Sequence, residues 1–211
     1  MEMREVGKKE LIVASTKKMI LLKGYKKLLV EDITSDAGIA KGSFYTYFKS
    51  KNLVIDYILE KKIVDIENSF IIDKQISLKE FIKETVTQRI ILDDEKIKDE
   101  LILVNLFRNV ASLEDSTLLL LKRIEFLMIE RMKKIIFYYS KDIKIAKEDI
   151  DFYAKMLNNI IANFKTFDLF FCKKTNTFIK DIDDIKRKYQ TKELEKAINI
   201  ISESILKILT Y

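Results

Sequence analysis

Few residues in this sequence are suited to enzymatic chemistry. There is no histidine, so the commonest general base and the commonest metal ligand are both missing. The single cysteine, Cys172, follows two phenylalanines and has no histidine to activate it, which favours an inert apolar role. No glycine follows Gly42, which leaves no glycine-rich phosphate loop. The sequence therefore predicts a protein that is not an enzyme and uses no metal or cofactor.

Side chains suited to DNA contact cluster between residues 41 and 51. Lysine and serine can bind base edges or phosphate oxygens, and tyrosine hydroxyls suit phosphate oxygens. A glycine lets a helix backbone approach DNA closely, since a side chain there would hold it away. The candidate DNA-binding residues are Lys41, Gly42, Ser43, Tyr45, Tyr47 and Lys51. Half-buried packing is the alternative explanation for the two tyrosines.

Two short helices meeting at a tight turn would position these side chains. Ile33 and Ala37 lie four residues apart on the first helix, and Gly38 breaks it. Phe44 and Phe48, also four apart, give the second helix an inward face. A turn containing glycine between two such helices is the helix-turn-helix signature, in which the second helix enters the DNA major groove.

At these residues the sequence resembles the TetR family of bacterial transcriptional regulators, over about the first quarter of the chain. The matching positions are Gly24-Tyr25, Ile33, Ala37-Gly38-Ile39, Gly42, Phe44-Tyr45, Tyr47-Phe48 and Lys51. Leu29 and Ala40 depart from the family pattern, because Ser or Thr usually caps both helices at these places. The resemblance implies a DNA-binding head, a helical body that binds a small, often lipophilic ligand, and a homodimer.

Charge and composition divide the chain in the same way. Residues 1–51 contain 11 Lys/Arg against 6 Asp/Glu, whereas residues 52–211 contain 28 against 27. There is no proline, which argues for long helices. We therefore predict an all-α fold with a DNA-binding domain at residues 1–51 and a ligand-binding and dimerisation domain at residues 52–211.

Apolar spacing and capping residues predict the individual helices. The expected ranges are Lys8–Lys23, Val30–Ala37, Lys41–Phe48, Lys51–Asn68, Leu78–Ile90, Asp94–Ser112, Asp115–Ser140, Ala146–Lys173 and Thr191–Leu209. Ser50 and Ser77 are expected to cap the helices that follow them.

Two further sets of residues are assigned to the body. Isolated amides and arginines among aromatic side chains are typical of a pocket lining; the candidates are Arg89, Asn105, Phe107, Arg108, Asn109, Phe126, Asn163, Phe164 and Phe167. Satisfied core polarity or surface exposure is the alternative for each of them. The last two helices are apolar beyond one stripe, which favours a dimer interface; its candidates are Phe152, Met156, Ile160, Phe171, Ile198, Ile201, Ile205 and Ile208. The alternative is that both stripes are buried within one chain.

These observations predict a ligand-responsive transcriptional regulator, a repressor that a small effector releases from a palindromic operator in double-stranded DNA. The alternative is an architectural or cell-division DNA-binding protein of the same fold without an effector. A cytoplasmic location, on the nucleoid when bound to DNA, is expected. The start of the chain is too charged for a secretory signal, and no apolar run approaches the ~20 residues that span a bilayer.

Overall fold

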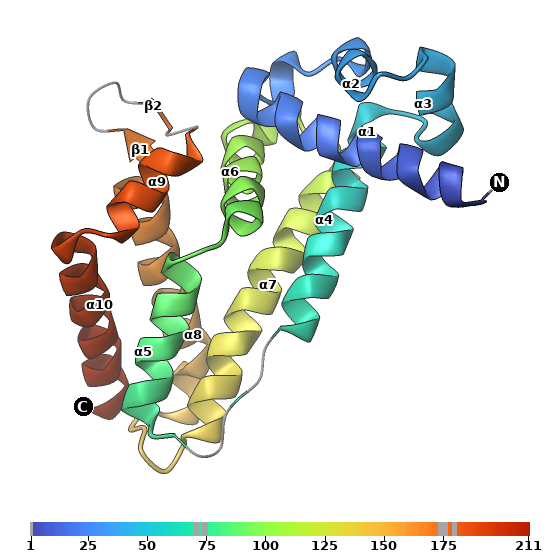
Figure 1. The fold of residues 1–211 in the computed structure, drawn as a ribbon. Helices are drawn as coiled ribbons and strands as arrows, with labels where there is room; N and C mark the ends of the chain where they lie inside the picture. The colour runs from blue at the N-terminus through green and yellow to red at the C-terminus, as the bar shows by residue number, and fades with distance from the viewer. Residues whose placement is uncertain (1, 70–71, 73–75, 173–176, 179–180) are drawn as a thin grey trace. The chain divides into compact units, whose positions relative to one another are not determined.

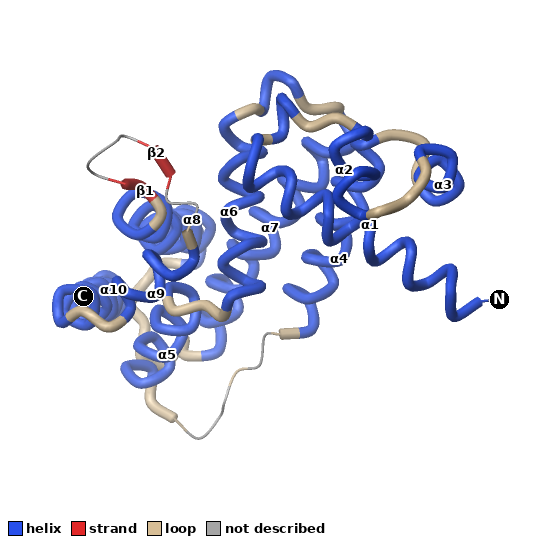
Figure 2. Tube along the Cα trace, turned by 45° about the horizontal axis from the view of Figure 1, so that its top comes forward, coloured by secondary structure: helices blue, strands red, loops and turns tan. Residues whose placement is uncertain are grey.

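Helices account for nearly all regular structure in the computed structural model, which describes residues 2–69, 72, 76–172, 177–178 and 181–211 (Figure 1). The α-helices are α1 (Glu2–Lys23), α2 (Val30–Ala37), α3 (Lys41–Tyr47), α4 (Lys51–Asn68), α5 (Leu78–Ile90), α6 (Asp94–Arg108), α7 (Asp115–Tyr138), α8 (Ile150–Asn163), α9 (Ile182–Tyr189) and α10 (Lys192–Thr210). Within these described ranges, Figure 2 shows strands only at the short antiparallel pair β1 (Phe171–Cys172) and β2 (Thr177–Phe178). The predicted all-α class is confirmed.

The chain folds into two compact units. Unit 1 comprises Met1–Asp65 and Lys96–Ile124, and unit 2 comprises Ile66–Glu95 and Glu125–Tyr211. Helices α4, α6 and α7 each contribute residues to both units. Residues 1–51 lie entirely within unit 1, and the functional boundary between residues 51 and 52 stays a prediction.

The helix-turn-helix forms as the sequence predicts. Gly38 ends α2 with φ 64°, a left-handed conformation that glycine adopts without steric cost. Helix α1 packs on α2, and α2 packs on α3. The side chains of Ile33 and Phe44 are fully buried and Phe48 is nearly so, which anchors both helices from their inner faces. The four-residue spacing of apolar side chains in the sequence therefore correctly predicts which face of each helix lies inward.

Polar side chains tie this head to other parts of unit 1. The backbone N–H of Tyr25 donates to Oδ1 of Asn105 at 2.8 Å, and the Tyr25 hydroxyl donates to Oδ1 of Asn52 at 3.0 Å. Burial raises the pKa of Tyr25, and the nearby carboxylates of Glu114 and Asp56 raise it further. Unit 1 therefore has a buried polar network beside its apolar core.

Unit 2 is built around α5 and α10, which pack against each other and both contact α8. Ser77 caps α5 as predicted: its hydroxyl accepts from the N–H of Glu80 at 3.3 Å, and the Glu80 carboxylate accepts from the N–H of Ser77 at 3.0 Å. Val86 and Ile90 on α5 and Leu209 on α10 are buried in the core of this unit.

Three predicted helix assignments are wrong in part, and one helix was missed. Helix α1 begins at Glu2 and not at Lys8. Helix α6 stops at Arg108 and is followed by a 3₁₀ turn, Val110–Ser112, instead of continuing to residue 112. The helix expected over residues 146–173 is α8 followed by a π-helical segment, Phe164–Leu169, and then β1; no glycine or proline marks this change in the sequence. Helix α9 was not predicted, because Ile185 is its one buried residue and eight residues give no clear periodicity.

Candidate nucleic-acid interface

Helix α3 presents one anchored face and one free face. Phe44 is fully buried and packs edge-on against the ring of Tyr45 at 5.4 Å between centroids. Lys41, Gly42 and Tyr45 are exposed, and Ser43 and Tyr47 are half-buried. Five of the six predicted DNA-binding residues therefore lie on this seven-residue helix. Three of them are exposed, and the other two are half-buried. A structure of the chain alone does not test contacts with DNA, so the assignment of these residues stays a prediction.

Gly42 has no structural reason to be glycine within this chain. A Cβ at this position would meet nothing within 4 Å beyond its chain neighbours and the backbone of its own helix, and the backbone of Gly42 is not left-handed. Gly38 differs, because its positive φ requires glycine. The absence of a side chain at Gly42 thus leaves the helix surface open to something outside the chain.

One residue of the free face was missed from the sequence. Thr46 is exposed next to Tyr45, and its hydroxyl donates to the Gly42 carbonyl at 3.2 Å. Threonine at this position carries no motif signal, but its place one residue after Tyr45 and four after Gly42 puts it on the same face. The exposed surface of α3 is therefore made of Lys41, Gly42, Tyr45 and Thr46.

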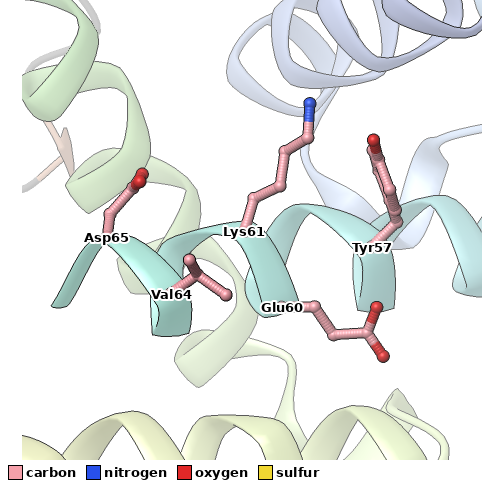
Figure 3. A pocket seen from close by; sticks show the side chains of 5 residues that line it. All are labelled: Tyr57, Glu60, Lys61, Val64 and Asp65. Atoms are coloured by element: carbon pink, nitrogen blue, oxygen red, sulfur yellow. The ribbon is translucent and has the colours of Figure 1, made fainter. Parts of the chain in front are cut away.

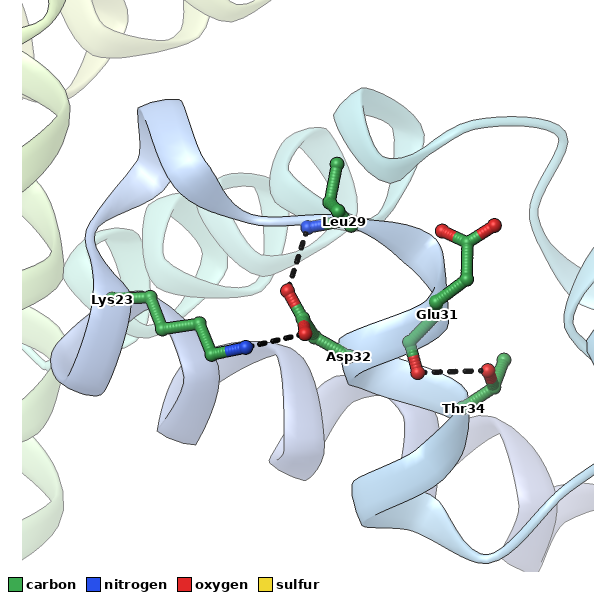
Figure 4. Close-up of polar contacts among 5 residues, drawn as sticks. All are labelled: Lys23, Leu29, Glu31, Asp32 and Thr34. Carbon is green, nitrogen blue, oxygen red and sulfur yellow. Dashed lines mark hydrogen bonds and ion pairs between the residues drawn. The ribbon is translucent and has the colours of Figure 1, made fainter.

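Helices α3 and α4 begin at the predicted residues, Lys41 and Lys51. Leu29 and Ala40 precede α2 and α3 without a side-chain cap, and Asp32 instead accepts from the Leu29 N–H at 3.2 Å (Figure 4). Ser50 caps α4 through its hydroxyl, which accepts from the Leu53 N–H at 3.3 Å. The starts of α2 and α4 are thus held by side chains at different positions, Asp32 within α2 and Ser50 before α4.

Lys51 has a structural role that the sequence did not reveal. Its ammonium group donates to the Leu28 carbonyl at 2.9 Å and lies 4.9 Å from the centre of the Tyr25 ring. Partial burial lowers the pKa of Lys51. A phosphate contact by Lys51 would use the remaining donors of an ammonium group that already holds the head together.

Lys41 forms an ion pair with Glu31 across the helix-turn-helix. Both side chains remain exposed, at 53% for Lys41 and 59% for Glu31. Hydrogen bonding to Lys41 lowers the pKa of Glu31, and the same bond raises the pKa of Lys41. Both groups are therefore charged at neutral pH.

Four of the predicted ligand-binding residues lie in unit 1, and the two asparagines among them make structural hydrogen bonds. Asn105 accepts from the Tyr25 N–H, and Asn109 donates to the Asn105 carbonyl at 2.8 Å where α6 ends. Phe107 and Arg108 are exposed. The interpretation of Asn105 as a ligand contact is therefore replaced by satisfied core polarity, because its amide oxygen is engaged by the backbone of the head.

The other five lie in unit 2 and do not form one lining. Arg89 donates to Asn158 at 2.8 Å and so joins α5 to α8. Phe126, Asn163 and Phe167 are exposed, and Phe164 is half-buried. The aromatic residues that suggested a pocket lining thus include two exposed side chains, those of Phe126 and Phe167.

None of the nine predicted residues lines either of two pockets found among the described residues. One, of about 450 Å³, is bordered by five side chains of α4 alone, Tyr57, Glu60, Lys61, Val64 and Asp65 (Figure 3). Most of these side chains are exposed, so it is a surface depression. The other, of about 340 Å³, lies in unit 2 along α5 and the start of α10, and includes Lys83, Thr87, Tyr189, Leu194 and Asn199.

The predicted dimer residues divide into core and surface. Ile198 and Ile205 are only 5% and 2% exposed within the chain itself, because α10 packs them into unit 2. They are therefore corrected to core residues. Phe152 is 66% exposed, and a set of half-buried residues accompanies it: Met156, Ile160, Ile201 and Ile208. Phe171 lies in β1, and its side chain is outside the described part.

Two features are absent from the described residues. Among them, no helix is both long and apolar enough to cross a bilayer. No group of three or more Asp, Glu, Cys or His side chains in the same residues is arranged to hold a metal ion.

Together, the anchored α2 and α3, the exposed face of α3 and the helical units define a helix-turn-helix protein of the DNA-binding class. The profile of the family described as "Bacterial regulatory proteins, tetR family" matches residues 12–58, from α1 into α4. Residues 12–58 therefore carry the DNA-binding domain of the TetR family, which is a family of HTH-type transcriptional regulators and not of enzymes.

Two curated relatives from Bacillus subtilis (strain 168) are similar over part of the chain. The HTH-type transcriptional regulator YvdT is 44% identical over 54 residues, covering 26% of this chain and 28% of YvdT. The HTH-type transcriptional regulator YerO is 29% identical over 113 residues, covering 43% of this chain and 39% of YerO. The matched part thus spans less than two thirds of either relative.

Solved structures share the fold over nearly the whole chain. Salmonella enterica GusR superposes with a TM-score of 0.70 at 12% identity, covering 95% of this chain and 96% of GusR. A transcriptional regulator from Rhodococcus sp. Rha1 superposes with a TM-score of 0.67 at 14% identity, covering 96% and 98%. At this identity the likeness concerns the fold alone.

Proposed function

We propose that this chain is a homodimeric, ligand-responsive repressor that releases a palindromic operator when a small effector binds. The observation that carries the proposal is the free face of α3. Its exposed residues are polar, except for Gly42, which has no side chain. Phe44 and Phe48 anchor the helix from the opposite face. Gly42 in particular is open only toward the surroundings. Such a helix suits insertion into the major groove of duplex DNA.

The proposed DNA contacts are of two kinds, contacts with base edges and contacts with phosphate oxygens. Lys41 at the start of α3 is placed for base edges, since the N-terminal part of a recognition helix contacts them. Tyr45 and Tyr47 offer hydroxyl donors to phosphate oxygens on either side of the groove. Two such heads would bind half-sites about one helical turn, ~34–36 Å, or a multiple of it apart.

Dimerisation is assigned to the exposed apolar face of α8. Phe152, Met156 and Ile160 follow one another at intervals of four residues, which places them on one side of the helix. Ile201 and Ile208 of α10 are only half-buried in the single chain. A partner that covered these side chains would remove a large apolar surface from water.

The effector is assigned to unit 2. Its pocket of about 340 Å³ falls within the size range of small-molecule sites, and its lining mixes Leu194 and Ile198 with Thr87, Asn199 and Lys83. An effector that binds one conformation of the dimer better than another would shift the population of heads able to reach both half-sites. A coupling of ~1–3 kcal/mol changes operator affinity about 5–150-fold.

One observation favours the alternative, an architectural or cell-division DNA-binding protein without an effector. The nine residues predicted to line a ligand pocket do not gather in either pocket described above. Many dispersed binding sites and no ligand-induced release would support this second function. Either function places the protein in the cytoplasm, on the nucleoid when bound.

Fluorescence anisotropy with duplex fragments from the region upstream of the gene tests the DNA-binding part. Wild type should bind one fragment with a strong dependence on salt, and Tyr45→Phe should bind it about 3–10-fold more weakly, through loss of one hydroxyl contact. Tyr138→Phe is the matched control, because both tyrosines are 39% exposed and Tyr138 lies on α7. Equal affinity of Tyr45→Phe and wild type would contradict the contact assignment, and no binding by wild type would overturn the function.

A further inference from the structure

Two consecutive lysines lie on the short connection between α1 and α2. They belong to a 3₁₀ turn, Tyr25–Lys27, and both of their side chains are exposed. The residues on either side are anchored, because Tyr25 is only 3% exposed and Leu28 is fully buried. The Leu28 N–H donates to the Tyr25 carbonyl at 3.1 Å and closes the turn. A fixed backbone therefore presents the side chains of Lys26 and Lys27 to solvent.

The charges of Lys26 and Lys27 are not neutralised by nearby carboxylates. Asp32, in the first turn of α2, pairs with Lys23 at the end of α1 (Figure 4), and Glu31 in the same turn pairs with a lysine of α3. In the part of the chain that the structure describes, Lys26 and Lys27 make no ion pair and no side-chain hydrogen bond. Their ammonium groups can therefore bind an anion without first leaving an internal partner.

The connection lies on the side of the motif where helix-turn-helix proteins meet the DNA backbone. The first helix of such a motif crosses the backbone, and in a three-helix version the loop before that helix contacts it. Here α2 is the first helix, and the turn lies directly before it. Lys51, already assigned to a phosphate, donates to the carbonyl of Leu28, the residue after Lys27, at 2.9 Å. Leu29 is 58% exposed and offers a phosphate no side-chain donor, so the nearest preceding donors along the chain are Lys27 and Lys26.

We propose that Lys26 and Lys27 bind the DNA backbone beside the groove that α3 enters, as an anchoring pair distinct from the residues of α3. Each ammonium group neutralises one phosphate group and releases about 0.9 of a condensed counterion from duplex DNA. Phosphate groups carry no base information, so the two contacts strengthen binding to an operator and to unrelated DNA by the same factor. They position the head on the duplex, and the residues of α3 provide the sequence preference. This inference rests on the proposed DNA-binding function.

Single substitutions at each position test the inference. Lys26→Gln and Lys27→Gln remove one positive charge per chain, whereas Lys26→Arg and Lys27→Arg keep it. Lys79→Gln is the matched control, because Lys79 on α5 is also exposed and makes no ion pair or side-chain hydrogen bond among the described residues. The probes are a duplex that wild type selects from a random pool and a scrambled duplex of the same length and composition. Fluorescence anisotropy gives both dissociation constants from about 50 to 300 mM KCl.

Each glutamine variant removes one phosphate contact from each head, and so two from a bound dimer. The slope of log K against log[salt] should therefore flatten by about two units, and both duplexes should bind about 25–60-fold more weakly at about 100 mM KCl. The ratio of the two affinities should stay within about twofold of the wild-type ratio. The arginine variants should keep the wild-type slope, because a guanidinium group also binds phosphate. Lys79→Gln should change neither slope nor affinity, and every variant should melt within about 2 °C of wild type.

A wild-type slope in Lys26→Gln or Lys27→Gln would overturn the contact of that lysine. Equal changes in Lys79→Gln would assign the effect to net charge and overturn both contacts, and an equal loss in the arginine variants would overturn the role of charge. Weaker binding of the selected duplex alone would overturn the phosphate assignment. In each of these cases, tight binding of the selected duplex by wild type would leave the proposed function intact. Failure of wild type to bind either duplex would overturn the function and this inference together.

Discussion

Replacement of Asn105 by alanine should destabilise the protein in the absence of any ligand. Oδ1 of Asn105 accepts from the backbone N–H of Tyr25 at 2.8 Å, and Tyr25 is only 3% exposed. Asn105→Ala leaves this donor without a partner, and the small cavity offers no full replacement by water. A buried donor that loses its acceptor costs about 1–3 kcal/mol.

The expected net effect is somewhat smaller, because alanine is the better helix former within α6 by about 0.5 kcal/mol. A net loss of about 1–2 kcal/mol corresponds to a fall in Tm of about 3–6 °C for a chain of this length. The assay is thermal unfolding followed by circular dichroism at 222 nm. Protein concentration is held constant, because association shifts the apparent stability.

Asn109→Ala provides the matched control for this experiment. Asn109 lies four residues further on, and its amide donates to the Asn105 backbone carbonyl, which remains in both variants. We expect Tm to fall by less than about 2 °C in Asn109→Ala, because a carbonyl at a partly exposed helix end can bind water instead. A Tm of Asn105→Ala within 1 °C of wild type, or an equal loss in Asn109→Ala, would refute the structural role of Asn105.

Two further predictions concern Tyr25 and the dimer. The raised pKa of Tyr25 means that the folded state binds the phenol proton more tightly than the unfolded state does. The stabilisation that results from this tighter binding is complete below about pH 10 and is lost as the pH rises further. Urea unfolding between pH 8 and 11 should therefore show a shallower alkaline decline for Tyr25→Phe than for wild type, and parallel curves would contradict this. Phe152→Glu should raise the dissociation constant of the proposed dimer at least about a hundredfold in sedimentation equilibrium, by placing a charge in an apolar contact. Phe137→Glu on α7, where Phe137 is similarly exposed at 59%, should leave it unchanged.

The head could be predicted almost completely because its signals are local. Gly38 marks a left-handed helix end, and Phe44 and Phe48 mark a buried face four residues apart. Ser77 and Glu80 form a capping box that is visible in the sequence three residues apart. Each of these features depends on neighbours within one or two helical turns.

The errors concern partners that lie far apart in the chain. Asn105 was assigned to a ligand because an amide in an apolar helix needs a partner, and its partner is a backbone N–H 80 residues earlier. Ile198 and Ile205 were assigned to a dimer because periodicity shows that a face is apolar and not what covers it. In the structure α10 packs against α5 and buries both within the chain. The ion pair of Glu31 with Lys41 was also missed, because its partners lie on two helices that are joined by a turn.

The discontinuous course of unit 1 matters for protein engineering. A fragment that ends at residue 65 would contain the whole helix-turn-helix but would lack residues 96–124 of the same unit. Tyr25 would then lose Asn105, and the buried carboxylate of Asp56 would lose the hydroxyl of Thr117, which donates to it at 2.5 Å. A chimera that transplants this head onto a different sensor should therefore carry both segments, spliced at three positions within helices α4, α6 and α7.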